Sequence, residues 1–262
     1  MLTSPPAPTT LKASERASIR GALANASVAA PFGAIEFWVR ESGMDAKLGR
    51  RGLITSSAGG FVLCLVGKTH AQEPRPLRLL MLGDSITAAY GLSRGEGLPA
   101  RLEAALRGKG RPVTVIDAGV SGDTTAGGRA RLDWSLAERP DAVIVALGGN
   151  DGLRAIEPRT SRANLAGILD TLKARGLPTM LAGMYAPPNL GADYGREFAG
   201  LYEALAKEHP EAVFYPFLLD GVAGDPALNQ ADGIHPNPRG VDEMVRRLLP
   251  AVETLLEKVR PA

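Results

Sequence analysis

From residue 77 onward, short apolar runs alternate with longer amphipathic stretches, and this alternation restricts the possible folds more than any other feature. The first run, 77–82, is almost continuously hydrophobic, which is typical of a strand buried on both faces of a parallel sheet. Strand-like runs occupy 77–82, 112–117, 141–147, 178–184 and 212–217, and helix-like stretches occupy 97–107, 124–138, 160–175, 195–208 and 238–258. The alternation predicts an α/β domain, with helices on both faces of a parallel sheet.

Residues 72–262 are the predicted domain, and about 190 residues are enough for one such sheet with its core. The sequence has no internal repeat and requires no second domain. Asn237 followed by Pro238 suits the N-cap and first position of the last helix.

The chain in front of this domain has a different character. Residues 1–43 are rich in Ala, Ser, Thr and Pro and carry no sustained period. We expect a disordered extension there, or a stretch that precedes a true start at Met44.

Residues 44–71 have the three parts of a secretory signal peptide. A basic leader over 44–51 precedes an uncharged, mostly apolar run over 53–67, and Ala71 supplies a small residue before Gln72. A core helix or strand over 53–66 is the alternative interpretation. The signal peptide predicts a periplasmic or secreted protein, exported by the general route or, given Arg50-Arg51, by the twin-arginine route.

Composition excludes several classes of partner and site. A net charge of +2 provides no electrostatic case for nucleic-acid binding. Cys64 is the single cysteine, so disulfides within the chain and cysteine-based zinc sites are excluded. The apolar run at 53–67 is too short, and too rich in Gly and Ser, for a stable membrane anchor.

Four polar clusters fall at the predicted ends of strands or directly before the last helix. They are Gly83-Asp84-Ser85, Gly119-Val120-Ser121-Gly122-Asp123-Thr124, Gly148-Gly149-Asn150-Asp151 and Asp232-Gly233-Ile234-His235-Pro236-Asn237. Open α/β sheets bind ligands at the carboxyl ends of their strands, so the four clusters are expected to form one site.

Ser85 is the candidate nucleophile, placed where the first strand ends and a short helix is expected to begin. An N-cap serine is the alternative interpretation. A serine hydroxyl needs a base within hydrogen-bond reach, and His235 is the candidate, with Asp232 three residues earlier to orient it. His70 would be lost with the signal peptide, and His209 lies in a charged helix end and is expected at the surface.

A tetrahedral intermediate also needs hydrogen-bond donors for its oxyanion. The candidates are the backbone N–H groups of Ser85 and Gly122 and the side-chain amide of Asn150. Taken singly, each glycine cluster is better explained by an ordinary tight turn. Asp84 and Asp151 are expected to hold backbone N–H groups in their own turns rather than to form an acid/base pair.

Together these clusters resemble the GDSL, or SGNH, serine hydrolases. Gly83-Asp84-Ser85-Ile86, Ser121-Gly122-Asp123-Thr124, the run 147–154 and Asp232-Gly233-Ile234-His235-Pro236-Asn237 are most similar to the bacterial arylesterase and thioesterase I/lysophospholipase branch. Two departures are small: Ile86 replaces the commoner Leu, and Asp117-Ala118-Gly119 stands where Asn-Ala-Ser is frequent.

The resemblance, which covers about residues 76–258, implies a flavodoxin-like three-layer α/β/α sandwich with a five-stranded parallel sheet. It implies Ser85 as nucleophile, His235 as base, Asp232 as its orienter, and Ser85, Gly122 and Asn150 as the oxyanion hole. It implies no metal or organic cofactor, and it suggests that the loop at 185–191 flanks an acyl pocket.

The expected function is therefore an exported serine esterase that hydrolyses small-molecule acyl esters or thioesters of the arylesterase, acyl-thioesterase or lysophospholipase type. A carbohydrate O-deacetylase on the same scaffold is one alternative. A non-catalytic exported α/β binding module is another, and the intact set of Ser85, Asp232, His235 and Asn150 disfavours it.

Overall fold

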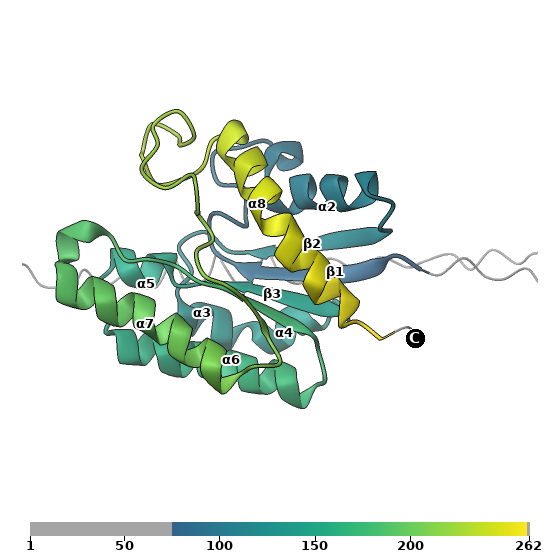
Figure 1. The fold of residues 1–262 in the computed structure, drawn as a ribbon, viewed down its shortest axis with the longest axis horizontal. Coiled ribbons are helices and arrows are strands. Elements are labelled where there is room, and N and C mark those ends of the chain that lie inside the picture. Colours follow the sequence, from purple (N-terminus) through teal and green to yellow (C-terminus); the bar gives the residue numbers. More distant parts are fainter. Residues whose placement is uncertain (1–74, 261–262) are drawn as a thin grey trace, which may run out of the picture. The chain divides into compact units, whose positions relative to one another are not determined.

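A five-stranded parallel sheet forms the centre of the fold in Figure 1, a computed structural model that describes residues 75–260. The strands are β1 (Leu77–Gly83), β2 (Val113–Gly119), β3 (Ala142–Ala146), β4 (Thr179–Ala182) and β5 (Val213–Tyr215). Their order, β2-β1-β3-β4-β5, is that of flavodoxin-like sheets, and every neighbouring pair is parallel. The predicted fold class is confirmed. The predictions for residues 1–43 and 44–71 lie outside the described residues.

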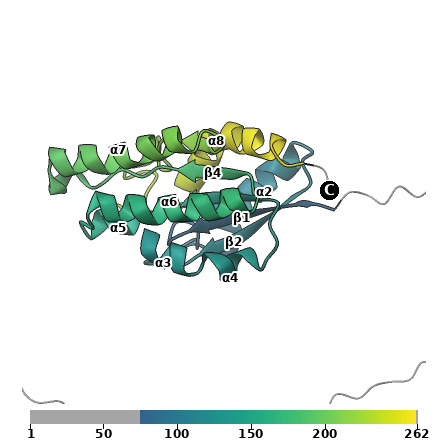
Figure 2. The ribbon, with the colours of Figure 1, turned by 90° about the horizontal axis from the view of Figure 1, so that it is seen from below.

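Helices cover both faces of this sheet. They are α2 (Leu98–Gly108), α3 (Thr125–Ala130), α4 (Leu132–Leu136), α5 (Gly149–Leu153), α6 (Pro158–Ala174), α7 (Ala192–Glu208) and α8 (Pro238–Glu257), with 3-10 turns η1 (Arg94–Glu96) and η2 (Pro188–Leu190). The helices α2 and α8 lie together on one face, and α3, α4, α6 and α7 lie on the other (Figures 1 and 2). This division follows from right-handed crossovers combined with a reversal of direction after β2.

The strand order creates a switch point between β1 and β3. The chain moves outward from β1 to β2 and then returns past β1 to β3. Gly83 at the end of β1 lies in register with Gly119 of β2 and Ala146 of β3, so the three strands end level. The loops that follow them leave the same edge of the sheet, which is where such sheets bind ligands.

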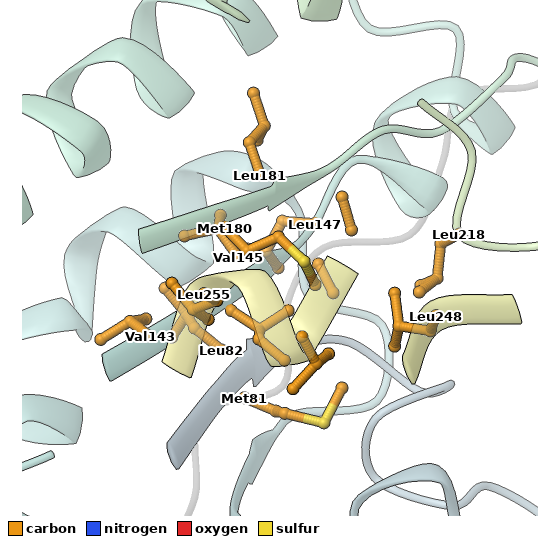
Figure 3. Close-up of a cluster of buried hydrophobic side chains, with 14 of the residues drawn as sticks. Met81, Leu82, Val143, Val145, Leu147, Met180, Leu181, Leu218, Leu248 and Leu255 are labelled. Carbon is orange, nitrogen blue, oxygen red and sulfur yellow. The ribbon is translucent and has the colours of Figure 1, made fainter. Parts of the chain in front are cut away.

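The core lies on both faces of the central strands. Residues 79–82 of β1 and 142–145 of β3 are fully buried, as their continuous hydrophobic pattern predicts. Figure 3 shows one buried cluster, which includes Met81 from β1, Val145 from β3, Met180 from β4, and Leu248 and Leu255 from α8.

The last helix begins as predicted. The side chain of Asn237 accepts hydrogen bonds from the backbone N–H groups of Arg239 at 3.0 Å and Gly240 at 3.1 Å, and Pro238 follows the cap. These bonds satisfy donors that the first turn of a helix leaves free. Because α8 starts at this cap, the polar residues directly before it are held at a defined place.

One predicted helix is wrong in its extent, and one helix was not predicted. The stretch 124–138 is divided into α3 and α4 at Arg131, whose φ of −102° and ψ of 6° leave the helical region. The Arg131 guanidinium is bound to the Asp123 carboxylate at 2.6 Å and to the Gly83 carbonyl at 2.8 Å, which ties this break to the end of β1. The unpredicted helix, α5, has only five residues, too few for a periodic pattern.

None of the helices within residues 75–260 combines the length and the apolar character needed to cross a bilayer.

Candidate active site

Ser85 lies in a tight turn at the end of β1. This turn spans residues 83–91 and begins with the last residue of the strand; we call it the Ser85 turn. The short helix predicted here is not formed. Instead the Ala88 N–H donates to the Asp84 carbonyl and the Tyr90 N–H to the Ser85 carbonyl, both at 3.0 Å, and Ala89 has a positive φ of 55°. A left-handed residue cannot continue an α-helix, so the segment closes as successive turns.

Glycine at position 83 allows this turn to fold back on the strand. A Cβ atom there would lie 2.0 Å from Oγ1 of Thr87, a distance at which something must move. Ser85 therefore leaves the strand end where the side chain of Thr87 packs closely on the backbone of Gly83.

His235 and Asp232 lie in the segment before α8, residues 229–237, which we call the His235 loop. Oδ1 of Asp232 accepts hydrogen bonds from the backbone N–H groups of Ile234 at 2.9 Å and His235 at 3.0 Å. Oδ2 of Asp232 lies 2.6 Å from Nδ1 of His235. Hydrogen bonds from the His235 backbone and ring and from the Ile234 backbone lower the pKa of Asp232 to about 2.

The loop brings His235 to Ser85, 150 residues away in sequence. Nε2 of the imidazole lies 2.8 Å from Oγ of Ser85. An ionised Asp232 can only accept hydrogen bonds, so Nδ1 of His235 carries the proton. In the neutral ring Nε2 is then a free acceptor for the Ser85 hydroxyl. The side chain of His235 is 17% exposed, and the ring of Tyr90 lies 4.6 Å from it, centroid to centroid.

Asn150 lies at the start of α5, immediately after β3. This start requires Gly148, whose φ is 119° and where a Cβ atom would lie 1.9 Å from the hydroxyl oxygen of Tyr202. That hydroxyl donates to the Leu147 carbonyl at 2.9 Å and so fixes the end of β3. The amide of Asn150 donates to Oδ2 of Asp84 at 3.4 Å, which places it beside the residue next to Ser85.

Gly122 lies three residues beyond Gly119, where β2 ends level with β1. Its φ of 83° belongs to the left-handed region that favours glycine. The Gly122 carbonyl accepts a hydrogen bond of 2.8 Å from the guanidinium of Arg154, the C-cap of α5. This bond joins the loop after β2 to the helix that carries Asn150. The sequence showed Arg154 only as part of a family motif, with no signal for this contact.

The prediction that two aspartates hold backbone N–H groups in their own turns is confirmed for Asp84 and wrong for Asp151, whose carboxylate binds residues of two other helices. Oδ1 of Asp84 accepts the Ile86 N–H at 3.1 Å. The fully buried Asp151 accepts the N–H of Thr125 at 2.8 Å, its hydroxyl at 2.6 Å and the Ser161 hydroxyl at 2.8 Å, which joins α5 to α3 and α6. Burial raises the pKa of Asp84 to about 6.

The prediction for His209 is wrong, because its side chain is buried rather than at the surface. Its backbone N–H closes the end of α7 on the Leu205 carbonyl at 2.9 Å. It precedes β5 and so lies at the opposite edge of the sheet from Ser85. The imidazole lies between the carboxylates of Asp170 on α6, 3.9 Å from Nε2, and Glu211, 3.5 Å from Nδ1. His209 plays no part in the site.

Several large apolar side chains are exposed on the loops around Ser85. The ring of Tyr185, in the loop at 185–191, is stacked on Phe217 at 4.3 Å between centroids and is 53% exposed. The others on these loops and on the adjoining α5 are Tyr90, Val120, Leu153 and Ile234. Within residues 75–260, no group of three or more His, Cys, Asp or Glu side chains is arranged to hold a metal ion.

Similarity to known proteins shows the family of this chain. The model of the GDSL-like Lipase/Acylhydrolase family matches residues 81–242, which span every polar cluster described above. The chain belongs to this family.

Relatives at about 40% identity support the same assignment. The chain is 40% identical to the esterase TesA of Pseudomonas aeruginosa over 194 residues, 74% of this chain and 96% of the relative. It is 38% identical to the thioesterase 1/protease 1/lysophospholipase L1 of Escherichia coli K12 over 179 residues, 66% of this chain and 84% of the relative. The crystal structure of AlinE4, an SGNH-hydrolase family esterase, is 47% identical with a TM-score of 0.59 and covers 71% of this chain and 99% of its own.

This GDSL-family protein is thus a serine esterase, and its substrates are esters.

Proposed function

We propose that the protein hydrolyses acyl esters and thioesters through an acyl-enzyme formed on Ser85. The observation that carries the proposal is the continuous hydrogen-bonded chain from Oγ of Ser85 to Nε2 of His235 at 2.8 Å and from Nδ1 to Asp232 at 2.6 Å. This chain supplies the nucleophile, the base and the group that orients the base.

In the first half of the reaction, Oγ of Ser85 attacks the carbonyl carbon while Nε2 of His235 takes the hydroxyl proton. The tetrahedral intermediate then expels the alcohol or thiol, which takes its proton from Nε2. In the second half, His235 removes a proton from water, which attacks the acyl-enzyme, and returns that proton to Oγ of Ser85 as the carboxylic acid leaves. Asp232 stabilises the imidazolium in both halves.

The oxyanion of the intermediate needs hydrogen-bond donors that are already in place, and one such donor typically lowers the activation barrier by about 3–4 kcal/mol. The backbone N–H groups of Ser85 and Gly122 and the amide of Asn150 are the proposed donors. This assignment is supported by the sheet, because β1, β2 and β3 end level with one another and each of the three residues follows one of these ends.

The exposed apolar side chains on the surrounding loops favour small or medium acyl chains or aryl groups. Tyr90, Val120, Leu153, Tyr185 and Ile234 expose apolar surface on α5 and on the loops at this edge of the sheet. The names of the relatives, an esterase and a thioesterase/lysophospholipase, support a range that includes oxyesters and thioesters. Periplasmic or extracellular action, after removal of residues 44–71, is part of this proposal, and N-terminal sequencing of the mature protein tests it.

Fluorophosphonate labelling combined with p-nitrophenyl ester turnover tests the nucleophile. We expect labelling and activity in the unaltered protein and their loss in Ser85→Ala. Ser93→Ala is a matched control, because the Ser93 hydroxyl is bound at 2.6 Å to Glu96 on the surface and should leave both readouts intact. An unlabelled native protein, or a fully active Ser85→Ala variant, would refute the proposal.

A further inference from the structure

Besides the contact of His235 with Ser85, the side chain of Gln230 joins the Ser85 turn to the His235 loop. Its amide nitrogen Nε2 donates to the Tyr90 carbonyl at 2.8 Å and to the Pro236 carbonyl at 3.0 Å. Tyr90 belongs to the Ser85 turn, 140 residues before Gln230, and Pro236 follows His235 directly. An amide nitrogen has two hydrogens, so Gln230 directs one to each segment.

The backbone of Gln230 also forms hydrogen bonds within the His235 loop. Its N–H donates to the His235 carbonyl at 2.7 Å, and its carbonyl accepts the Gly233 N–H at 3.0 Å. The segments on either side of His235 are therefore held to Gln230 by both its main chain and its side chain.

The Ser85 turn is shaped to receive this amide. Gly91 has a φ of 73°, and a Cβ atom at that position would lie 2.1 Å from Oε1 of Gln230. The absence of a side chain at Gly91 is thus what allows the amide to approach the Tyr90 carbonyl.

These contacts act on His235 from two sides. The His235 carbonyl is held by the Gln230 N–H, and the ring of Tyr90, whose own carbonyl is held by the Gln230 amide, lies 4.6 Å from the imidazole. We propose that Gln230 is a positioning residue that keeps Nε2 of His235 within hydrogen-bond reach of Oγ of Ser85. The inference rests on the proposed roles of Ser85 and His235.

Removal of the amide should affect the chemical step more than substrate binding. Gln230 reaches the reacting atoms only through Tyr90 and the His235 loop. A displacement of a catalytic group by about 1 Å can lower a rate by about 100-fold. We expect Gln230→Ala to lower kcat for a p-nitrophenyl ester by about 10- to 100-fold with little change in KM, and to slow fluorophosphonate labelling in proportion.

Gln230→Glu provides the second variant. It keeps the length and shape of the side chain but replaces both donors with a carboxylate that faces two carbonyl oxygens. We expect Gln230→Glu to lose at least as much kcat as Gln230→Ala, even if Gln230→Glu has the higher midpoint of thermal unfolding.

Asn229→Ala is the matched control. Asn229 is the first residue of the His235 loop, but its amide points to the preceding segment, where it donates to the backbone carbonyls of Val222 at 2.7 Å and Asp225 at 2.8 Å. Neither carbonyl belongs to the Ser85 turn. Truncation of Asn229 should lower thermal stability at least as much as Gln230→Ala, because Asn229 is buried, with a much smaller loss of kcat.

Proton NMR distinguishes a displacement of His235 from a general loss of stability. The low-field resonance of the proton between Nδ1 of His235 and Asp232 should persist in Asn229→Ala and should shift or broaden in both Gln230 variants. The inference is overturned if Gln230→Ala keeps kcat within about two-fold of the native value, or if Asn229→Ala loses as much kcat at equal stability. Failure of the proposed function would appear separately, as an unlabelled native protein or an active Ser85→Ala variant.

Discussion

Asp84 illustrates how one buried side chain links stability to the site. It is 3% exposed, and its two oxygens accept the Ile86 N–H and the Asn150 amide. In the folded protein its pKa is about 6, whereas an unfolded chain has a value of about 3.9. Between these pH values the folded state binds the proton and the unfolded state does not. The free energy of unfolding therefore falls as pH rises from about 4 to about 6, and the loss persists at higher pH.

We expect Asp84→Asn to remove this pH dependence. The variant should be more stable than the native protein at pH 8, by about 3 kcal/mol, with a smaller difference at pH 4. Its kcat should fall, because an amide at position 84 faces the amide of Asn150. Urea unfolding at pH 4, 6 and 8 measures the stability of both proteins. If the free energy of unfolding of Asp84→Asn falls with pH as steeply as that of the native protein, the buried ionised carboxylate is not the cause.

Asp232→Asn tests the orientation of the imidazole. An amide hydrogen in place of Oδ2 would oppose the proton on Nδ1 of His235 and favour the other tautomer, in which Nε2 cannot accept from Ser85. We expect kcat to fall by about 10³- to 10⁴-fold with little change in KM. Because the pKa of Asp232 is about 2, its carboxylate stays ionised above about pH 3 and should not contribute an acid limb to the activity profile.

Asp225→Asn is the control for this change. Oδ1 of Asp225 accepts the Ala227 N–H at 2.8 Å in a similar exposed turn that lacks a histidine. Its activity should remain close to the native value, and equal losses in the two variants would contradict a specific role for Asp232.

At the level of elements, the site depends on how β3 passes into α5. Gly148 turns the chain with a φ of 119° against the Tyr202 hydroxyl, and Asn150 follows within the first turn of α5. The short helix is then tied to its neighbours by Asp151 and Arg154. The position of Asn150 is thus a property of the strand–helix junction.

Gly148→Ala should disrupt this junction. The added methyl group would meet the Tyr202 hydroxyl in a strained backbone conformation, so we expect a loss of about 3 kcal/mol or more in stability and a large loss of activity. Gly195→Ala in α7 is the control, since no atom lies within 4 Å of the place its methyl group would occupy, and it should be neutral or stabilising by up to about 1 kcal/mol. Thermal unfolding with ester turnover measures both, and a stable, active Gly148→Ala variant would contradict the proposed geometry.

At the scale of the whole molecule, the sheet, its two helical layers and the complete candidate site all lie within residues 75–260. A chain that begins at Gln72 should therefore fold and hydrolyse p-nitrophenyl esters with the kcat of the full chain. Circular dichroism, thermal unfolding and turnover of the two chains check this. A truncated chain that fails to fold, or that folds without activity, would show that the preceding residues contribute to the domain.

The elements and most of the candidate site can be predicted from the sequence, because they depend on local patterns. A strand buried on both faces is a short continuous apolar run, and a helix buries one face at a fixed period. The apolar pattern therefore predicted β1 to β5 and α8 with small errors at their ends. It overlooked α5, which is too short to show a period, and the break at Arg131, which depends on contacts with Asp123 and Gly83. The burial of His209 likewise depends on a tertiary contact, because α6 brings Asp170 to within 3.9 Å of its ring.

The sequence by itself determined that this chain forms a parallel α/β sheet and that Ser85, Gly122 and Asn150 leave it at one edge. It did so because parallel strands all present their carboxyl ends to the same side. Only the tertiary structure decided the 2.8 Å approach of His235 to Ser85, the bond between Arg154 and Gly122, and the bridge made by Gln230. These contacts join residues 32 to 150 positions apart, and their distances depend on how the loops pack, which no local pattern records.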